Sequence, residues 1–168
     1  SPNPKGLMEY ISTCKREFKP QTKFQYSCLN YITLQHIIET ITGQSLRDFA
    51  KENIFDILGM QYTDYLPTIQ QQDGKWINTV ACPWMDWIAP TEKQKDGSVL
   101  CGQVHDPLAR ILNGGISGNA GIFSNANDIG ILAAALLNGG EYNGRRILSP
   151  LGVKTMCTVP RELTAFGR

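Results

Sequence analysis

The sequence predicts a mostly α-helical domain, with five or six helices, long loops and little strand. Apolar residues recur at the i, i+3, i+4, i+7 spacing of one helix face, most clearly over residues 34–41. A polar capping residue followed by proline, which is typical of a helix start, occurs at residues 3–4, 106–107 and 149–150. At 168 residues the chain suits one domain. A domain of that size can bury about two thirds of its unfolded surface.

The individual helices are predicted from their cap signals. In chain order the predicted helices run from Asn3–Pro4 to the charged run 15–17, from near Ser27 to Gly43, and from Ser45 to Gly59. Three more run from Asp106–Pro107 to Leu112, from Ser124 or Asn127 to Asn138, and from Ser149–Pro150 to near Cys157. Glycine suits a helix C-terminus because it adopts the left-handed conformation without steric cost. Ser45 with Asp48 resembles a capping box.

Residues 60–103 are predicted to be the least regular part of the chain. Residues 70–74 form a turn, residues 75–80 suit a short strand, and Asp96-Gly97 can turn a small hairpin between residues 91–92 and 99–100. A loop of this length inside a domain usually binds a ligand, acts as a lid or covers the core.

Composition excludes several classes of function. Hydrophobic residues make up 42% of the chain, charged residues 18%, and the formal net charge is +1. No long basic run is present, which argues against a nucleic-acid partner. No apolar stretch approaches the roughly 20 residues that span a membrane. Residues 1–4 lack the basic and apolar regions of a signal peptide.

Cysteine and histidine usage predicts neither a metal site nor a disulfide framework. The five cysteines are an odd number without a C-x-x-C pair, and only two histidines are present. We therefore expect no metal site, and no motif in the sequence implies an organic cofactor. One disulfide, between Cys82 and Cys101, stays open.

Three local patterns could carry chemistry. Ser12 with Lys15 matches Ser-x-x-Lys, but it lies within a predicted helix and runs into charged residues, so chance explains it better. Cys28 could be a thiol nucleophile with His36 or His105, although nothing in the sequence places them together. The glycine-rich residues 114–121 fit neither the dinucleotide nor the P-loop fingerprint, and are interpreted as a tight loop.

Five stretches together resemble one superfamily. Residues 24–31 followed by 42–46, then 54–63, 102–106, 114–124 and 143–150, are similar to conserved segments of the serine β-lactamase and penicillin-binding protein superfamily, in its esterase-like branch. In that superfamily the corresponding segments include the motifs Tyr-Ser-Asn, Thr-Gly-x-x-Leu, Val-His-Asp and Gly-His-Ala-Gly-Leu-Phe-Ser. The resemblance covers nearly the whole chain in one order.

The resemblance implies roles for particular residues. Tyr26 would exchange protons with a nucleophilic serine and the leaving group. Cys28 stands where these proteins usually have Asn or Asp, which changes the expected hydrogen bond to substrate or lysine. Substrate-binding positions are implied at Cys28, His105, Gly115 and Asn119.

The resemblance also implies an architecture. Residues 1–168 would be a single helical domain of the β-lactamase/transpeptidase-like fold, excised from a larger protein and lacking the α/β sheet domain. The Ser-x-x-Lys motif would precede this chain, and a Lys-Thr-Gly or His-x-Gly strand would follow it. The chain alone is then expected to be inactive.

The parent would act on β-lactam, peptide or ester substrates through an acyl-enzyme, in the periplasm or at the cell surface. Expected partners are the missing α/β domain and a second copy, through an exposed apolar face at residues 84–88 and around Gly115. One alternative is a non-catalytic helical binding or sensor module. A second alternative is a thiol hydrolase that uses Cys28.

Overall fold

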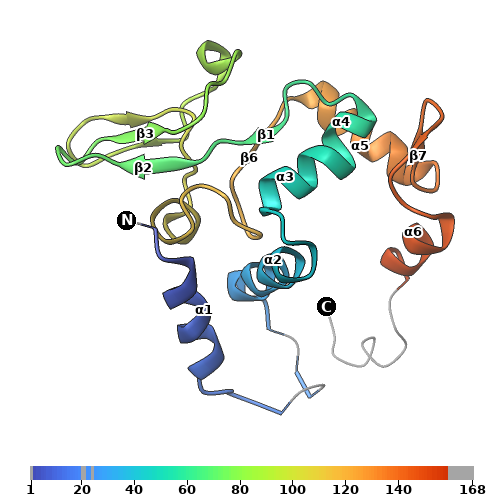
Figure 1. Ribbon diagram of the computed structural model, residues 1–168, viewed down its shortest axis with the longest axis horizontal. Coiled ribbons are helices and arrows are strands. Elements are labelled where there is room, and N and C mark those ends of the chain that lie inside the picture. Colours follow the sequence, from blue (N-terminus) through green and yellow to red (C-terminus); the bar gives the residue numbers. More distant parts are fainter. Residues whose placement is uncertain (1, 20–21, 24, 159–168) are drawn as a thin grey trace.

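The computed structural model describes residues 2–19, 22–23 and 25–158. Within them the chain is mostly helical, as predicted, and its elements spread from a hairpin end around β2 and β3 to α6 at the opposite end (Figure 1). The α-helices are α1 (Pro4–Thr13), α2 (Cys28–Thr42), α3 (Leu46–Ala50), α4 (Asp56–Leu58), α5 (Ala126–Leu137) and α6 (Pro150–Met156).

Side-chain caps begin four of these helices where the sequence predicts them. The Asn3 side chain accepts a hydrogen bond from the Gly6 N–H at 3.0 Å, which starts α1. Ser27, Ser45 and Ser149 accept equivalent bonds at the starts of α2, α3 and α6. Each cap satisfies an N–H group that has no partner inside its helix.

The start of α5 differs from the prediction of Ser124 or Asn127. Asn125 caps this helix, because its Oδ1 accepts from the Asp128 N–H at 2.8 Å. Ser124 instead shares a 2.7 Å hydrogen bond with Thr63, a contact across the fold that the local sequence does not reveal.

Two helical segments adopt π geometry. Lys51–Phe55 joins α3 to α4 in one run that ends at Gly59 in the left-handed conformation. Leu108–Leu112 forms the short helix expected after Asp106, whose Oδ1 accepts from the Ala109 N–H at 2.9 Å. The sequence predicts both helices, but not the π turns within them.

The strands form four small antiparallel pairs. These are β1 (Asp64–Tyr65) with β6 (Ile122–Phe123), β2 (Thr68–Gln70) with β3 (Trp76–Asn78), β4 (Glu92–Lys93) with β5 (Val99–Leu100), and β7 (Glu141–Tyr142) with β8 (Arg145–Arg146). The hairpin predicted around Asp96-Gly97 is confirmed as β4–β5, and the strand predicted within residues 75–80 is β3.

The core lies between the α3–α4 run, β1 and α5. Its buried members are Leu46, Ala50, Phe55, Leu58, Met60, Tyr65 and Ala135. Arg47 closes one side, where it makes a two-pronged contact with Asp64 at 3.0 and 2.6 Å.

Of the apolar stripe that predicts α2, one residue, Ile38, packs against this core. Leu34, Ile37 and Ile41 are 54%, 45% and 78% exposed, and the neighbouring Tyr31 is 45% exposed. The buried residues of α2 are Ile32 and Gln35, which lie on a different side of the helix. The predicted helix is therefore confirmed, and most of the apolar stripe that predicted it is exposed.

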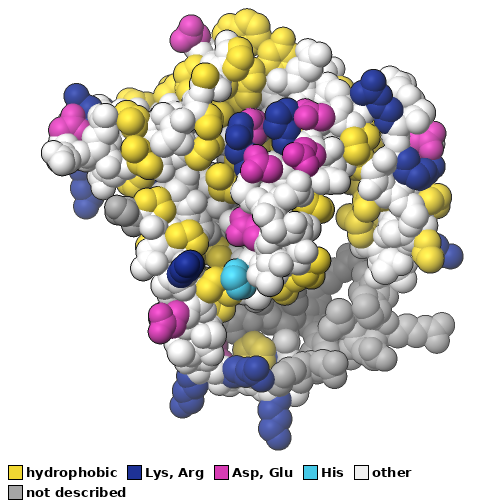
Figure 2. Space-filling model, viewed as in Figure 1, with side chains coloured by type: hydrophobic (Ala, Val, Ile, Leu, Met, Phe, Trp, Pro, Cys, Tyr) yellow, Lys and Arg dark blue, Asp and Glu magenta, His cyan; other side chains and the backbone are white. Residues whose placement is uncertain are grey.

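All five cysteines are free thiols, so the Cys82–Cys101 disulfide left open by the sequence is absent. The Cys101 thiol contacts the Ile88 carbonyl at 3.1 Å instead. No cluster of three metal-ligating side chains occurs among the described residues. None of the helices within those residues is long and apolar enough to cross a membrane. On the face in Figure 2, acidic and basic side chains intermingle over α3–α4.

Candidate functional site

Tyr26 lies immediately before Ser27, the residue that caps α2. Its side chain is 67% exposed, and its ring centroid is 6.3 Å from that of Tyr31 at an interplanar angle of 49°. The phenol therefore lies at the surface of the domain and not in its core. This position agrees with the expectation of a tyrosine on the rim of the domain, and its catalytic role stays a prediction.

Neighbouring groups make Tyr26 a weaker acid. Cys28, through a hydrogen bond and through its charge when ionised, is the largest cause that raises the pKa of Tyr26, followed by slight desolvation and the charges of Tyr31 and Asp106. A phenol with a pKa above about 10 is ionised in fewer than about one molecule in a thousand at pH 7. Tyr26 therefore needs a cation beside it before it can act as a base.

A cavity of about 570 Å³ lies next to Cys28. Ser27 and Cys28 of the α2 start line it on one side, Tyr10 of α1 on another, and Leu108 and Leu112 of the π segment on a third. Its walls are mainly apolar. The cavity therefore offers a place for an apolar group beside the start of α2.

His105 and Asp106 lie in a loop whose backbone is anchored by Arg110. The buried Arg110 guanidinium donates to the carbonyl oxygens of Val104 and His105 at 2.6 and 2.7 Å. The His105 ring is exposed, and its Nδ1 lies 3.3 Å from Glu92 Oε2. The charge of Asp106 is the smallest of the causes that raise the pKa of Tyr26. Because its polar contact is with Glu92, we interpret His105 as a residue that shapes the loop.

Gly115 is buried, and its environment explains why it is glycine. Its φ is +87°, and a Cβ there would lie 2.8 Å from the Leu66 carbonyl oxygen. Its N–H donates to the Ala109 carbonyl at 2.8 Å. Gly115 itself is therefore covered by Leu66 and Thr68, and a docking face at this loop stays a prediction. Substrate binding by Gly115 stays a prediction.

Asn119 belongs to a polar cluster within the same loop. Its Oδ1 accepts from the Ser117 hydroxyl at 2.7 Å, and Asn113 donates to that hydroxyl at 2.7 Å. Ser117 is 1% exposed, so this cluster fixes the loop. The hydrogen bonds of Asn119 go to the loop and not to Tyr26 or Cys28.

Gln35 is a positioning residue that the sequence analysis missed. It is 8% exposed; its Oε1 accepts from the Gly118 N–H at 2.9 Å, and its Nε2 donates to the Ile116 carbonyl at 3.2 Å. The same Nε2 donates to Glu39 Oε1 at 3.1 Å. These bonds fix the glycine-rich loop against α2. The signal was available, because a glutamine three residues after Ile32 lies on the same helix face as that apolar residue.

Ser12 and Lys15 do not form a nucleophile pair. Ser12 is exposed near the end of α1, and its hydroxyl donates to the Glu9 carbonyl at 2.8 Å. Lys15 follows the end of the helix and is also exposed. The chance interpretation of this Ser-x-x-Lys match agrees with the structure.

Comparison with known proteins gives consistent matches. A model of the family described as Beta-lactamase matches residues 1–164. The chain is 34% identical over 172 residues to an Escherichia coli K12 protein named "Putative D-alanyl-D-alanine carboxypeptidase", a match that covers 95% of this chain and 37% of that protein. The chain therefore spans little more than a third of this relative's length.

Two solved structures share the fold at low sequence identity. A D-stereospecific amidohydrolase from Streptomyces sp. superposes with a TM-score of 0.60 at 17% identity, over 95% of this chain and 40% of that one. A penicillin binding protein from Bacillus halodurans superposes with a TM-score of 0.52 at 16% identity, over 90% of this chain and 41% of that one. At these identities the likeness concerns the fold alone.

Proposed function

Since the chain belongs to the Beta-lactamase family, we propose that it forms the helical part of a longer serine hydrolase that works through an acyl-enzyme. In this proposal the nucleophilic serine and its lysine lie outside residues 1–168, and this chain supplies Tyr26. The chain alone is then inactive. The alternative is a non-catalytic binding or sensor module of the same family.

The exposed phenol of Tyr26 is the observation that carries this proposal. Tyrosine usually buries its ring and satisfies its hydroxyl when its role is structural. Tyr26 is 67% exposed and stands at the start of α2, beside the cavity that Cys28 lines. In the proposed enzyme Tyr26 acts as the phenolate, which takes the proton of the attacking serine and, as the phenol, returns it to the leaving group.

The raised pKa of Tyr26 supports the proposal that a positively charged group outside residues 1–168 must assist this tyrosine. A neutral phenol is a weak base, and a neighbouring ammonium group shifts its equilibrium toward the phenolate. The proposed lysine of the Ser-x-x-Lys motif supplies this charge. Without that lysine the proton stays on Tyr26, which is why the chain alone should not catalyse.

The exposed stripe of α2 supports the docking of further protein. Leu34, Ile37 and Ile41 are large apolar side chains on one helix, and each is at least 45% exposed. Contiguous exposed apolar surface is typical of interaction sites. We propose that the remaining α/β domain covers this stripe. Trp87, which is 76% exposed within the predicted face at residues 84–88, is a separate candidate contact for a second copy.

The relatives suggest the substrate. The Escherichia coli relative is named for D-alanyl-D-alanine carboxypeptidase activity. We propose a peptide that ends in D-alanyl-D-alanine as the first substrate to test, with β-lactams and esters as further acyl donors. Such substrates place the enzyme in the periplasm or at the cell surface.

Tyr26→Phe tests this function. In the protein expressed from its complete reading frame, loss of a positioned proton-transfer group should slow D-alanine release from a D-alanyl-D-alanine peptide by about 100-fold or more. The melting temperature should stay nearly unchanged, because the ring is kept and the hydroxyl is exposed. Tyr142→Phe, at the opposite end of the fold from α1, removes the same atom as a control and should keep the full rate.

Two outcomes would count against the proposal. If Tyr26→Phe keeps its rate but melts at a lower temperature, Tyr26 is structural. If the complete protein binds a penicillin without hydrolysing peptide or ester and without forming an acyl adduct, the non-catalytic module is the better interpretation.

A further inference from the structure

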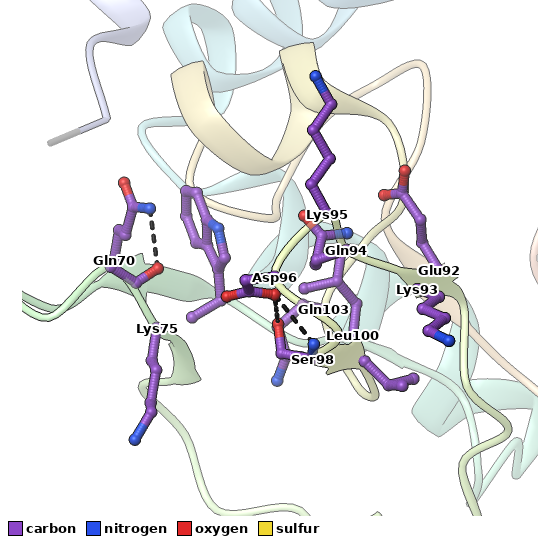
Figure 3. A pocket seen from close by; sticks show the side chains of 13 residues that line it. Gln70, Lys75, Glu92, Lys93, Gln94, Lys95, Asp96, Ser98, Leu100 and Gln103 are labelled. Carbon is purple, nitrogen blue, oxygen red and sulfur yellow. Dashed lines mark hydrogen bonds between the residues drawn. The ribbon is translucent and has the colours of Figure 1, made fainter.

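A second cavity lies between two hairpins, apart from the one beside Cys28. It has a volume of about 560 Å³, within the range of small-molecule sites. The β2–β3 hairpin forms one wall and the β4–β5 hairpin forms the other. Figure 3 shows Gln70 and Lys75 on the first side, with Gln94 and Asp96 opposite them.

Trp76 gives this cavity a fixed aromatic surface. The indole lines the cavity, and the Arg110 guanidinium carbon lies 5.4 Å from the centre of its ring. Arg110 is itself 6% exposed and anchored to the Val104 and His105 carbonyls, so it holds the indole in one orientation. An indole held in this way suits stacking against the C–H face of a saturated ring that carries polar groups.

The cavity also contains an unsatisfied donor. Gln94 lines it, and the Nε2 of that side chain is buried without a hydrogen-bond partner among the described residues. Figure 3 shows the Gln94 amide between Lys95 and Asp96, near the middle of the lining side chains. A buried donor without an acceptor is costly, so a ligand that brings a carbonyl or hydroxyl oxygen would be favoured.

The cavity carries charges of both signs, with a small excess of positive charge. Lys75, Lys93 and Lys95 line it together with the carboxylates of Glu92 and Asp96, and all three lysines are exposed to solvent. Lys75 lies 3.6 Å from Asp73, and Glu92 lies 3.8 Å from Arg110, so part of this charge is already paired. Asp96 accepts hydrogen bonds from the N–H and hydroxyl of Ser98 at 2.9 and 2.6 Å. A strongly anionic ligand would gain little from such a mixture. A neutral ligand with many hydroxyl and amide groups fits the set of donors and acceptors better.

From this combination we infer that the cavity between the two hairpins binds a neutral oligosaccharide that carries hydroxyl and acetamido groups. The C–H face of one sugar ring stacks on Trp76. An acetamido carbonyl accepts from the Gln94 amide, and its methyl group packs against the apolar wall at Val99 and Leu100. Gln70 and Asp96 hydrogen-bond to hydroxyl groups.

Glu92 lines the cavity and lies 3.3 Å from the His105 ring, so the cavity adjoins the loop that carries His105 and Asp106. Saccharide binding does not depend on the proposed hydrolase function, so the two can fail separately.

Isothermal titration calorimetry with two matched tetrasaccharides tests the inference. The probes are the β-1,4-linked tetramers of N-acetylglucosamine and of glucose, which differ in the acetamido group. The protein is expressed from its complete reading frame. The N-acetylglucosamine tetramer should bind at least about tenfold more tightly, since one good polar contact is worth about 1.4 kcal/mol, or tenfold in affinity. Inorganic phosphate should not compete.

Two variants locate the site. Trp76→Ala removes the stacking surface and should weaken binding at least tenfold. Because Arg110 packs on Trp76, that variant could lose stability, so Gln94→Ala is tested beside it. Gln94→Ala deletes a donor that has no protein partner, should melt like the parent and should lose the preference for the acetamido probe. Trp87→Phe, which alters an exposed tryptophan outside this cavity, should bind like the parent.

Several results would overturn the inference. These are no binding of either tetramer, equal affinity for both, displacement by phosphate, or unchanged affinity in both Trp76→Ala and Gln94→Ala. D-Alanine release from a short peptide without sugar reports the proposed hydrolase separately. Saccharide binding without peptide hydrolysis would therefore refute only the proposed function.

Discussion

Gly118→Ala should strongly destabilise the fold, because no space exists for a side chain at this position. A Cβ added to Gly118 would lie 2.8 Å from the Tyr31 carbonyl carbon, closer still to its oxygen, and 3.2 Å from the Cβ of Gln35. Gly118 does not have a positive φ, so the penalty is steric and not conformational. The glycine-rich loop and α2 must separate to admit a methyl group.

The size of the effect follows from the contacts that this separation breaks. The Gln35 side chain would lose its bonds to the Gly118 N–H and the Ile116 carbonyl. Two buried hydrogen bonds are worth about 1 kcal/mol each, and overpacking adds about 1–3 kcal/mol. We therefore expect a loss of about 3–5 kcal/mol in the free energy of unfolding, a large share of the total for a domain.

Gly130→Ala is the matched control for Gly118→Ala. Gly130 is exposed in the middle of α5, and a Cβ there would meet nothing within 4 Å. Alanine favours a helix over glycine by about 0.5–1 kcal/mol, so this variant should be more stable than the parent. Urea unfolding of residues 1–168, followed by far-UV circular dichroism, measures both. A cost below about 1 kcal/mol for Gly118→Ala, or equal effects of the two substitutions, would refute the packing described for this loop.

Two further predictions concern stability. Burial, with a smaller contribution from the Glu39 charge, raises the pKa of Tyr65 from 10.0 to about 12. As the pH rises, the unfolded chain releases this proton before the folded chain does, so the free energy of unfolding should fall between pH 10 and 12 by up to about 3 kcal/mol. Urea unfolding at pH 8 and pH 11 should show a smaller loss of stability for Tyr65→Phe than for the parent. Equal losses in the two proteins would refute the assignment. The Arg47–Asp64 pair, with side chains only 22% and 17% exposed, should show a coupling energy of about 1–3 kcal/mol in a double-mutant cycle with alanine. Additive effects would mean that the pair contributes nothing specific.

Local signals in the sequence predicted most of the elements. Caps at Asn3, Ser27, Ser45 and Ser149 depend on the side chain and the next three residues, so they can be identified without knowledge of the fold. Asn125 was missed because Ser124 and Asn127 are equally good caps by type. The bond of Ser124 to Thr63, 61 positions away, leaves Asn125 free to cap.

Long-range packing was less predictable. The apolar stripe at Leu34, Ile37, Ile38 and Ile41 predicted a helix, but not which of its residues are covered. Ile38 packs against the core, whereas the other three are exposed and Gln35 is buried. Periodicity shows which residues share a helix face, but not what covers that face. Gly115, which lies in a loop expected to contribute to an apolar docking face, is itself buried. A glycine that permits close backbone packing and a glycine in an exposed loop look alike in sequence.

The candidate site was only partly accessible to sequence reasoning. The position of Tyr26 before α2 follows from the Ser27 cap and from the resemblance. The effect of Cys28 on the pKa of Tyr26 requires the folded geometry. The cavity around Trp76 depends on two hairpins that meet in space, and the sequence predicted only the second of these as a hairpin.

Acylation of the complete protein locates its nucleophile directly. The protein, expressed from its complete reading frame, is incubated with a penicillin, quenched in acid, digested and sequenced by mass spectrometry. We expect the opened β-lactam on a serine of a Ser-x-x-Lys sequence outside residues 1–168, with adduct formation about 100-fold slower in Tyr26→Phe. An adduct on Ser12 or Cys28, or an undiminished rate in Tyr26→Phe, would contradict the role proposed for this chain.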